Sequence, residues 1–286
     1  MPADPFTLAR PQPPGLPRLA ARVCLTMAAR ALGLDACNAI YRQLQPSSSE
    51  PFADRVLHAL NIVPDCPWSD LAGVSSSGPL IVVANHPSGA VDGLVLLSLL
   101  QRVRPGVRLL ANHLLARVPE LADVCFFADP FGGPSAGARS LGGLRAARRW
   151  LAGGGALIVF PSGKVAHRRR TDGSYADSPW PATIGRIAIA SRAPVVPAFV
   201  AGSNRWSFYA AGCIHPTLRT ALLPRELLAK RGQTIAIRLG GVTRFEELVR
   251  SGEDGAAVTQ HLRDLVEALA LRHARSGHLV TGRERD

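Results

Sequence analysis

Apolar and polar positions follow two different periods along this chain. Short apolar runs rich in β-branched residues predict strands, and longer stretches with helical spacing lie between them. The expected strands span residues 80–85, 107–111, 124–128, 155–160, 194–200 and 234–239, and the expected helices span 91–103, 138–152, 180–192, 225–231, 244–250 and 255–275. Thr243 and Glu246 have the spacing of a capping box, which predicts that the helix over 244–250 begins there. Alternation of this kind predicts the α/β class, with a mostly parallel sheet flanked by helices.

The N-terminal pattern differs from the rest and predicts an additional helical segment. Residues 17–45 carry apolar residues among arginines at helical spacing, and residues 52–60 predict a short second helix. The apolar face flanked by arginine suits a membrane interface, and it equally suits a helix that covers one face of the core. These patterns divide the chain into a flexible N-terminus (1–16), a helical segment and candidate membrane-surface element (17–60), an α/β domain (61–275) and a tail (276–286).

Composition limits the class of protein and of partner. With 286 residues, 47% of them hydrophobic and 19% charged, the chain has the composition of a globular protein with a substantial core. The net charge is +12, and only Lys164 and Lys230 among the 33 cationic residues are lysine. Arginine forks suit phosphates. Nucleic acid, an anionic membrane surface and a phosphorylated substrate are all compatible with this charge, although a biased genomic base composition also explains the arginine content.

Several features are missing from the sequence. No run of 18 apolar residues occurs, so we expect no membrane span. Asp4 and several prolines interrupt the start, which argues against a signal peptide. The five cysteines are scattered and the histidines lack paired ligand spacing, so we expect reduced thiols in a cytoplasmic setting and no metal site.

The first candidate for chemistry follows the first predicted strand. Asn85, His86, Ser88 and Gly89 stand at its carboxyl end, where open α/β sheets bind their ligands. Asp92 falls in the first turn of the next helix, close enough to turn back toward His86. A histidine oriented by a carboxylate is a general base for a hydroxyl. The alternative is a hydrogen bond that only stabilises the turn, because the helix dipole favours aspartate at this position anyway.

A second strand end carries Pro161, Ser162, Gly163 and Lys164. Gly163 lets backbone amides approach an anion, and Lys164 adds charge, so the segment is a candidate cradle for a phosphate or carboxylate. An ordinary turn followed by a solvated basic run is the alternative. Ser162 is not expected to be a hydrolase nucleophile, because Phe160 stands where the nucleophile elbow requires glycine.

Two more strand ends complete the set of candidates. Asp129 follows the strand over 124–128, and Arg139 near the start of the next helix is placed to reach a phosphate or, alternatively, only solvent. Pro197 lies in an apolar strand that suits the wall of a chain-binding groove, and a core strand with edge prolines is the equal alternative.

Taken in order, these four segments resemble the PlsC-like glycerolipid and lysophospholipid acyltransferase family, over about residues 55–250. The family's first motif, Asn-His followed by aspartate, is matched by Asn85, His86 and Asp92, with one more residue between histidine and aspartate than in the general family. The spacing His-Pro-x-Gly-x-x-Asp-Gly is similar to the hemolysin-like branch, which includes acyltransferases of ornithine-type aminolipids. The resemblance implies the acyltransferase α/β fold.

The third motif departs from the family. Its usual form is Phe-Pro-Glu-Gly-Thr, and here Ser162 replaces the glutamate that helps to hold a glycerol phosphate acceptor in the general family. The resemblance therefore implies a lyso-lipid acceptor, either a lysophospholipid or a lyso-aminolipid, and the serine makes the second more credible.

The resemblance also implies a reaction, an O-acyl transfer. Asp92 fixes the imidazole tautomer, His86 takes the proton from the acceptor hydroxyl, and the oxygen attacks the thioester of acyl-CoA or of an acyl carrier protein. Backbone amides near Gly163, with Lys164, are expected to steady the oxyanion or the headgroup. The residues expected to contact substrate are Asn85, Ser88, Gly89, Asp129, Arg139, Pro161, Ser162, Gly163, Lys164 and Pro197. No bound cofactor is expected.

The expected partners are the lyso-lipid, the acyl donor and an anionic membrane surface. A bacterial enzyme of this kind is expected to lie peripherally on the cytoplasmic side of the inner membrane. A non-catalytic peripheral membrane-binding protein is the alternative function, because a basic surface and the helix over 17–45 suffice for it. Nucleic acid is not an expected partner, since the basic run has no interleaved aromatic residues and no binding motif is present.

Overall fold

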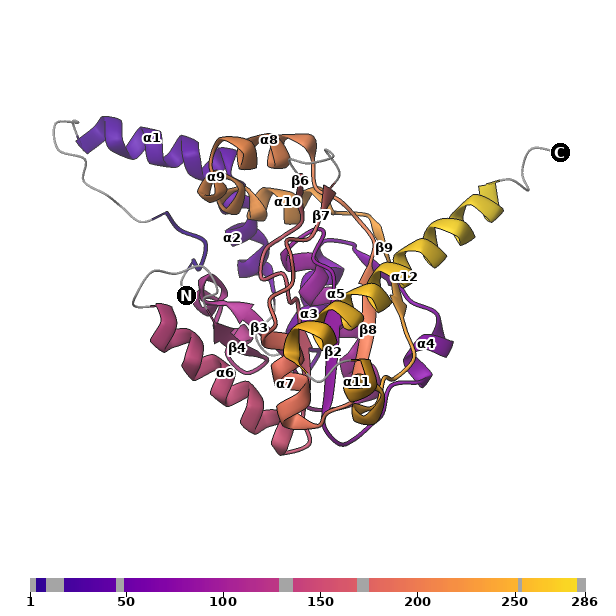
Figure 1. Ribbon diagram of the computed structural model, residues 1–286. Coiled ribbons are helices and arrows are strands. Elements are labelled where there is room, and N and C mark those ends of the chain that lie inside the picture. The colour runs from indigo at the N-terminus through magenta and orange to yellow at the C-terminus, as the bar shows by residue number, and fades with distance from the viewer. Residues whose placement is uncertain are drawn as a thin grey trace.

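A seven-stranded sheet forms the centre of the molecule (Figure 1). The computed structural model describes residues 4–8, 18–44, 49–128, 136–168, 175–251 and 254–281. The strand order is β1-β9-β8-β2-β5-β3-β4. The strands are β1 (Val63–Asp65), β2 (Leu80–Ala84), β3 (Val107–Asn112), β4 (Cys125–Ala128), β5 (Ala156–Val159), β8 (Val195–Val200) and β9 (Thr234–Leu239), and a separate small ribbon pairs β6 (His167–Arg168) with β7 (Tyr175–Ala176). All neighbours in the large sheet are parallel except β8 and β9, which confirms the predicted α/β class with a mostly parallel sheet.

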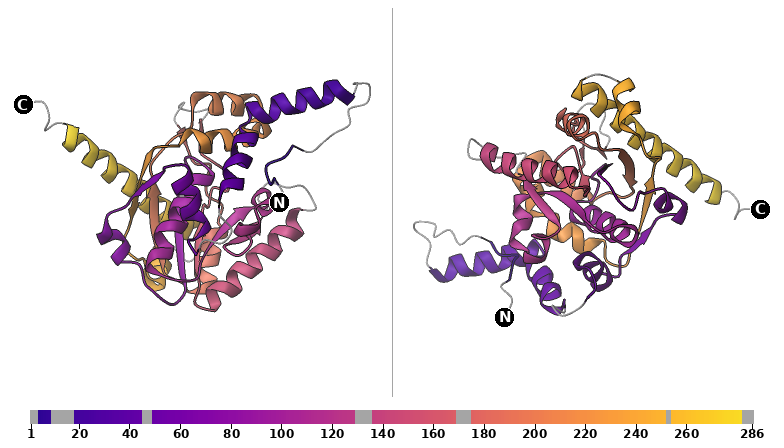
Figure 2. Two further views of the ribbon diagram at one scale, coloured as in Figure 1. Left: turned by 180° about the vertical axis from the view of Figure 1, so that it is seen from behind. Right: turned by 90° about the horizontal axis from the view of Figure 1, so that it is seen from below.

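Helices cover both faces of this sheet (Figures 1 and 2). The helices in the described residues are α1 (Arg18–Ala31), α2 (Leu34–Gln43), α3 (Phe52–Ala59), α4 (Trp68–Ala72), α5 (Ala90–Val103), α6 (Ala136–Ala152), α7 (Thr183–Ser191), α8 (Trp206–Ile214), α9 (Pro216–Ala221), α10 (Leu223–Ala229), α11 (Phe245–Ser251) and α12 (Gly255–Thr281). Every residue of β2 is buried. Leu80 and Val82 belong to the core on the side of α3 and α5, whereas Ile81 and Val83 belong to the core on the side of α7 and α12. A strand buried on both faces explains the unbroken apolar run in the sequence.

The prediction of one helix over residues 17–45 is wrong, because the chain breaks at Gly33. Gly33 has a φ of 75°, a conformation that favours glycine. A Cβ atom there would also lie 2.9 Å from the Leu228 side chain of α10. Beyond the break, α2 buries Cys37 and Tyr41 against the core, whereas α1 leaves Met27 67% exposed. The core-covering alternative therefore holds for α2, and the membrane-interface alternative remains a prediction for α1.

Residues 4–8, which lie in the segment expected to be flexible, run beside α2. The backbone of Phe6 exchanges two hydrogen bonds with the Asn38 side chain, at 3.0 and 2.8 Å. No single helix in the described ranges is both long and apolar enough to cross a membrane. The segments Arg22–Ala31 and Leu34–Gln43 have that length and composition together, but they are bent by 71° at the break between them.

Several predicted helix ends are shifted, among them the start of α11 and the end of α12. The predicted capping box had Thr243 as its first residue, but in the structure it is the Arg244 N–H that donates to a carboxylate three residues further on. The acceptor is Glu247, at 3.1 Å. The backbone of Thr243 is already paired with Val195 across the sheet, so the helix begins later. At the other end of the chain, α12 continues to Thr281, six residues beyond the predicted end of this helix and into the predicted tail.

Candidate active site

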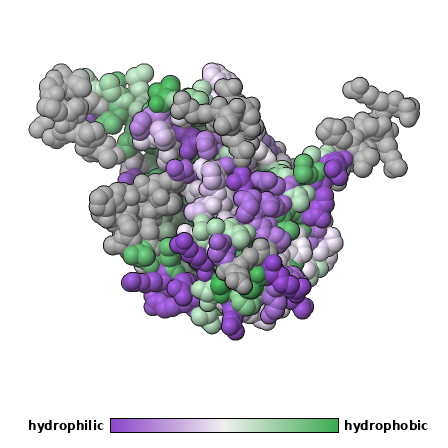
Figure 3. Space-filling view, viewed as in Figure 1, coloured by the Kyte–Doolittle hydropathy of each residue, from purple (hydrophilic) through white to green (hydrophobic). Residues whose placement is uncertain are grey.

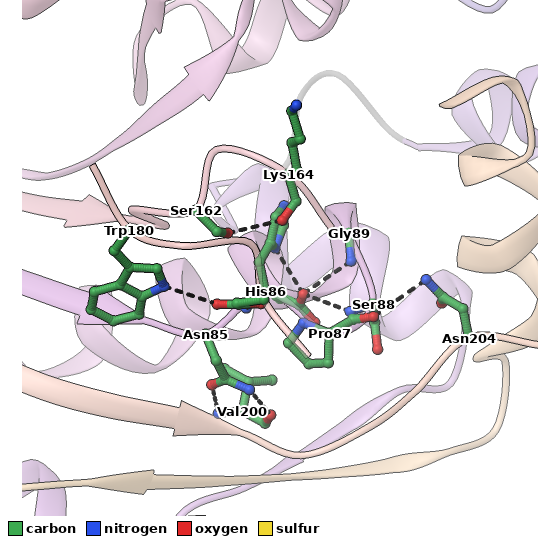
Figure 4. A network of polar contacts seen from close by, with 12 residues as sticks. Asn85, His86, Pro87, Ser88, Gly89, Ser162, Lys164, Trp180, Val200 and Asn204 are labelled. Carbon is green, nitrogen blue, oxygen red and sulfur yellow. Dashed lines mark hydrogen bonds and ion pairs between the residues drawn. The ribbon is translucent and has the colours of Figure 1, made fainter. Parts of the chain in front are cut away.

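Three loops meet at one edge of the sheet because β2 lies between β5 and β8. These strands are parallel, so their carboxyl ends point the same way. His86 follows β2, the segment from Phe160 to Lys164 follows β5, and Asn204 lies in the loop after β8 (Figure 4). The topology therefore brings the first and third segments that the sequence singled out together with the loop that follows the fourth.

Backbone hydrogen bonds hold the Asp92 carboxylate in place independently of the imidazole. Its side chain is fully buried in the first turn of α5, and its Oδ2 accepts the backbone N–H groups of Ser88 and Gly89 at 2.9 Å each. The same oxygen lies 2.9 Å from His86 Nδ1. Gly89 has a φ of 95°, which lets the chain turn so that its N–H points back at the carboxylate. The predicted His86–Asp92 contact is thus present, at hydrogen-bond distance.

The His86 ring is held on a second side by Phe160. The two rings are stacked with centroids 4.2 Å apart and planes 18° apart, and 18% of the histidine side chain remains exposed. When Nδ1 donates its proton to Asp92, the neutral ring presents Nε2 as an acceptor. No described residue hydrogen bonds to Nε2, so the ring can accept a proton from a hydroxyl there. The stacking role of Phe160 was not predicted, although this residue opens the third motif.

Asp177 makes a further contact with His86 that was not predicted from the sequence. Its Oδ1 accepts the backbone N–H of His86 at 3.1 Å, and its Oδ2 accepts the indole N–H of Trp180 at 3.2 Å. The carbonyl of His86 accepts the N–H of Ala166 at 2.8 Å, so the histidine backbone is held on both sides. No sequence pattern indicates this role, because Asp177 lies 91 residues from His86.

Asp177→Asn tests the burial of this carboxylate. Burial raises the pKa of Asp177, and the N–H of His86 works in the opposite direction. The folded protein therefore loses stability as pH rises from the unfolded pKa to the folded pKa, and asparagine removes that loss. We expect the free energy of unfolding of Asp177→Asn to increase relative to the wild type over this interval, in urea titrations between about pH 4 and pH 8. A difference that does not change with pH would contradict the raised pKa.

Two of the residues predicted to contact substrate form contacts within the sheet instead. Asn85 joins the ends of two strands, because its amide donates to the Val200 carbonyl and accepts the Val200 N–H, each at 2.8 Å. Pro197 lies buried within β8 opposite Val83, and its carbonyl accepts the N–H of Gly240 at 2.8 Å. The structure does not bring Pro197 to His86.

The loop after β5 is closed by its own hydrogen bonds. Pro161 and Ser162 are buried, and the Ser162 hydroxyl donates to the Lys164 carbonyl at 2.9 Å. Gly163 has a φ of 61°, and its N–H donates to the Phe160 carbonyl at 2.9 Å. The Gly163 amide therefore forms a hydrogen bond within the turn, whereas backbone amides near Gly163 were expected to contact the oxyanion. Lys164 is exposed and its side chain extends away from His86 in Figure 4.

The loop after β8 packs behind the His–Asp pair. The Asn204 amide donates to the Pro87 carbonyl at 3.3 Å, and a Cβ atom at Gly202 would lie 2.9 Å from the Ser88 hydroxyl. The buried ammonium of Lys230 donates to the Ser203 carbonyl of the same loop. Burial lowers the pKa of this lysine, whereas the nearby carboxylates of Asp92 and Glu226 work in the opposite direction.

Asp129 lies outside the described residues. Arg139 lies in α6, where the structure describes the backbone but not this side chain. Both residues remain predictions. Within the described residues, no group of three or more histidine, cysteine or acidic side chains is placed to hold a metal ion.

Comparison with known protein families places this chain among the acyltransferases. A model of the protein family described as Acyltransferase matches residues 11–267, and the chain belongs to this family. The expected membership of an acyltransferase family is thereby confirmed, and the protein is an acyltransferase.

Two comparisons with individual proteins agree with this assignment. The lyso-glycine lipid O-acyltransferase of Phocaeicola vulgatus is 29% identical over 206 residues, which cover 70% of this chain and 71% of that protein. The crystal structure of PlsC, the 1-acyl-sn-glycerophosphate acyltransferase of Thermotoga maritima, aligns with a TM-score of 0.50 at 15% identity. That alignment covers 88% of this chain and 98% of PlsC, and it supports the predicted fold.

Proposed function

We propose that this acyltransferase moves a fatty acyl chain from a thioester to the hydroxyl of a lyso-lipid, with His86 as the general base. The observation that carries the proposal is the contact of 2.9 Å between His86 Nδ1 and the buried Asp92 carboxylate, which leaves Nε2 to accept a proton.

The proposed reaction needs one base and one positioning residue. The acceptor hydroxyl gives its proton to Nε2 of His86, and its oxygen forms a bond to the thioester carbonyl carbon. The C–S bond then breaks, and the departing sulfur takes the proton from Nε2, so that the products are an ester and a free thiol. Asp92 stabilises the imidazolium that exists between these two proton transfers. The proposed donor is acyl-CoA or an acyl carrier protein, and no bound cofactor takes part.

A lyso-aminolipid is the acceptor that we propose first, ahead of a lysophospholipid. The relative from Phocaeicola vulgatus acts, by its name, on a lyso-glycine lipid. Ser162, which replaces the family's glutamate, is bonded to its own loop, so it does not reproduce the acceptor contact of that glutamate. Lys164 at the exposed rim of this loop is the proposed partner for an anionic headgroup.

The test is a product assay with defined substrates. Purified protein is incubated with acyl-CoA or acyl carrier protein and a panel of lyso-aminolipids and lysophospholipids, and products are identified by mass spectrometry. We expect an acylated lyso-aminolipid. Products from lysophospholipids alone would overturn the acceptor class, and no product from any pair would overturn the proposed reaction.

A peripheral location on the cytoplasmic side of the inner membrane is part of the proposal. The supporting feature is α1, on which Val23 is 51% and Met27 is 67% exposed among arginines and without an acidic residue. Deleting residues 1–45 would also remove the core contacts of Tyr41 in α2, so substitutions are the better probe.

We expect the double substitution Val23→Ser, Met27→Ser to weaken binding to phosphatidylglycerol-containing vesicles by roughly tenfold, because two apolar side chains no longer enter the interface. Co-sedimentation measures this change. The matched control is Leu271→Ser, which alters a side chain that is 62% exposed on α12. Equal binding by the double variant and the wild type would show that α1 does not contact lipid.

A further inference from the structure

The outward face of α8 is apolar along its whole length. Its exposed residues Trp206, Ala210, Cys213 and Ile214 recur at helical spacing, so they form one stripe. Trp206 is 78% and Ile214 is 77% exposed, and Leu218 on α9 adds a third large apolar side chain at 47%. A helix on the surface of a globular protein normally turns polar residues outward. A stripe of this kind indicates an interaction surface.

The inward face of the same helices is attached to the catalytic loops. Phe208 and Tyr209 of α8 form a small buried cluster with Val165, which directly follows the loop after β5. Leu223 of α10 lies against Gly89, since a Cβ atom at that glycine would be 3.0 Å from the leucine side chain. The cap helices, α8 to α10, therefore cover the catalytic end of the sheet, with their apolar stripe on the far side.

The charge around the stripe has one sign. Residues 205–225 contain Arg205, Arg219 and Arg225 and no aspartate or glutamate, in a chain with 21 acidic residues, and the next residue, Glu226, is buried rather than exposed beside the stripe. The described helix α1 has the same character. Apolar side chains among arginines, with no acidic residue, match the interface of a bilayer that contains anionic lipid.

The two acid-free elements lie at the same end of the molecule. Both ribbon views of Figure 2 and the view of Figure 1 place α1 close to α8 and α9, and Figure 3 shows apolar surface along α1 at this end. We infer that the α8–α9 stripe is a second membrane-contacting element, which binds an anionic bilayer together with α1 and holds the catalytic edge over the lipid surface. This binding does not depend on the proposed acceptor or mechanism.

Tryptophan fluorescence tests where Trp206 lies. Vesicles of phosphatidylglycerol and brominated phosphatidylcholine quench a tryptophan that enters the bilayer. We expect quenching in the wild type and in Trp68→Phe, and loss of most quenching in Trp206→Phe, which keeps an aromatic ring and so still binds. Trp68 is the matched control because it is 69% exposed on α4, away from the cap helices (Figure 1). Equal quenching in Trp206→Phe and the wild type would overturn the inference.

Affinity and activity complete the test. We expect the double substitution Trp206→Ser, Ile214→Ser to weaken binding to the same vesicles by roughly tenfold or more, and Trp68→Ser to leave it unchanged. Turnover of a short-chain lyso-lipid below its micelle concentration should be the same in all three proteins, which separates lipid docking from the reaction itself. If the double variant instead loses self-association or binding of acyl carrier protein and keeps vesicle binding, the stripe is a protein interface and the inference is wrong.

Discussion

Replacing His86 with alanine should lower kcat/KM for acyl transfer by on the order of 10²–10⁴-fold, the usual contribution of a general base. The His86→Ala variant lacks the imidazole, so no group at the former position of Nε2 can take the proton from the acceptor hydroxyl. The fold should survive, because the side chain is partly exposed and Asp92 keeps its bonds from the backbone of Ser88 and Gly89. Steady-state kinetics and thermal unfolding measure the two quantities separately.

The matched control for this variant is His58→Ala. His58 is an exposed histidine on α3 whose Nδ1 lies 2.7 Å from a Glu50 carboxylate oxygen, so it offers the same pair of groups on the surface. Exposed ion pairs contribute little to stability. We expect His58→Ala to turn over like the wild type. Near-normal turnover by His86→Ala would refute its role as the base.

The features that were predicted correctly depend on local signals. The buried run of β2 and the polar segment after it are contiguous in sequence, and the turn of α5 that carries Asp92 follows at once. The period of the hydrophobic residues and the positions of the turn residues directly indicate the structure of such contiguous segments. The His–Asp pair could therefore be placed at a strand end, and the contact of 2.9 Å in the structure agrees with it.

The features that were missed depend on contacts between distant parts of the chain. Asp177 reaches the backbone of His86 from 91 residues away, and no spacing rule covers that distance. Gly33 is an isolated glycine in a helical pattern, and such a glycine does not by itself predict the end of a helix. Its positive φ and the close approach of α10 end the helix there, and neither is visible until α10 is in place.

The apolar helix α8 was missed for a related reason. Its outward stripe and its buried Phe208 and Tyr209 make the segment apolar on both sides, so it lacks the polar face that marks a surface helix. A segment that violates the pattern of a soluble helix is more informative than one that obeys it, because such violations occur mainly at functional or interaction surfaces.

Asp92→Asn should be the second most damaging substitution, with a fall in kcat on the order of 10³–10⁴-fold by analogy with other His–Asp pairs. The amide has nearly the shape of the carboxylate but carries no charge, so it cannot stabilise an imidazolium. Oδ2 of Asp92 accepts three donors, from His86, Ser88 and Gly89. If the amide oxygen takes that place, its NH2 group falls at Oδ1, which has no hydrogen-bond partner among the described residues. We therefore also expect a loss of about 1–3 kcal/mol in the free energy of unfolding.

Asp54→Asn separates these two effects. Asp54 is a buried carboxylate on α3 that accepts the Ser98 hydroxyl and lies 3.4 Å from Arg102, in a different part of the core. Its substitution should also cost stability, with kcat unchanged at a temperature well below unfolding. Asp92→Asn should lose activity under the same conditions, where its fold is intact by urea denaturation. If its kcat stays within about threefold of that of Asp54→Asn, then Asp92 only holds the turn before α5 and takes no part in proton transfer.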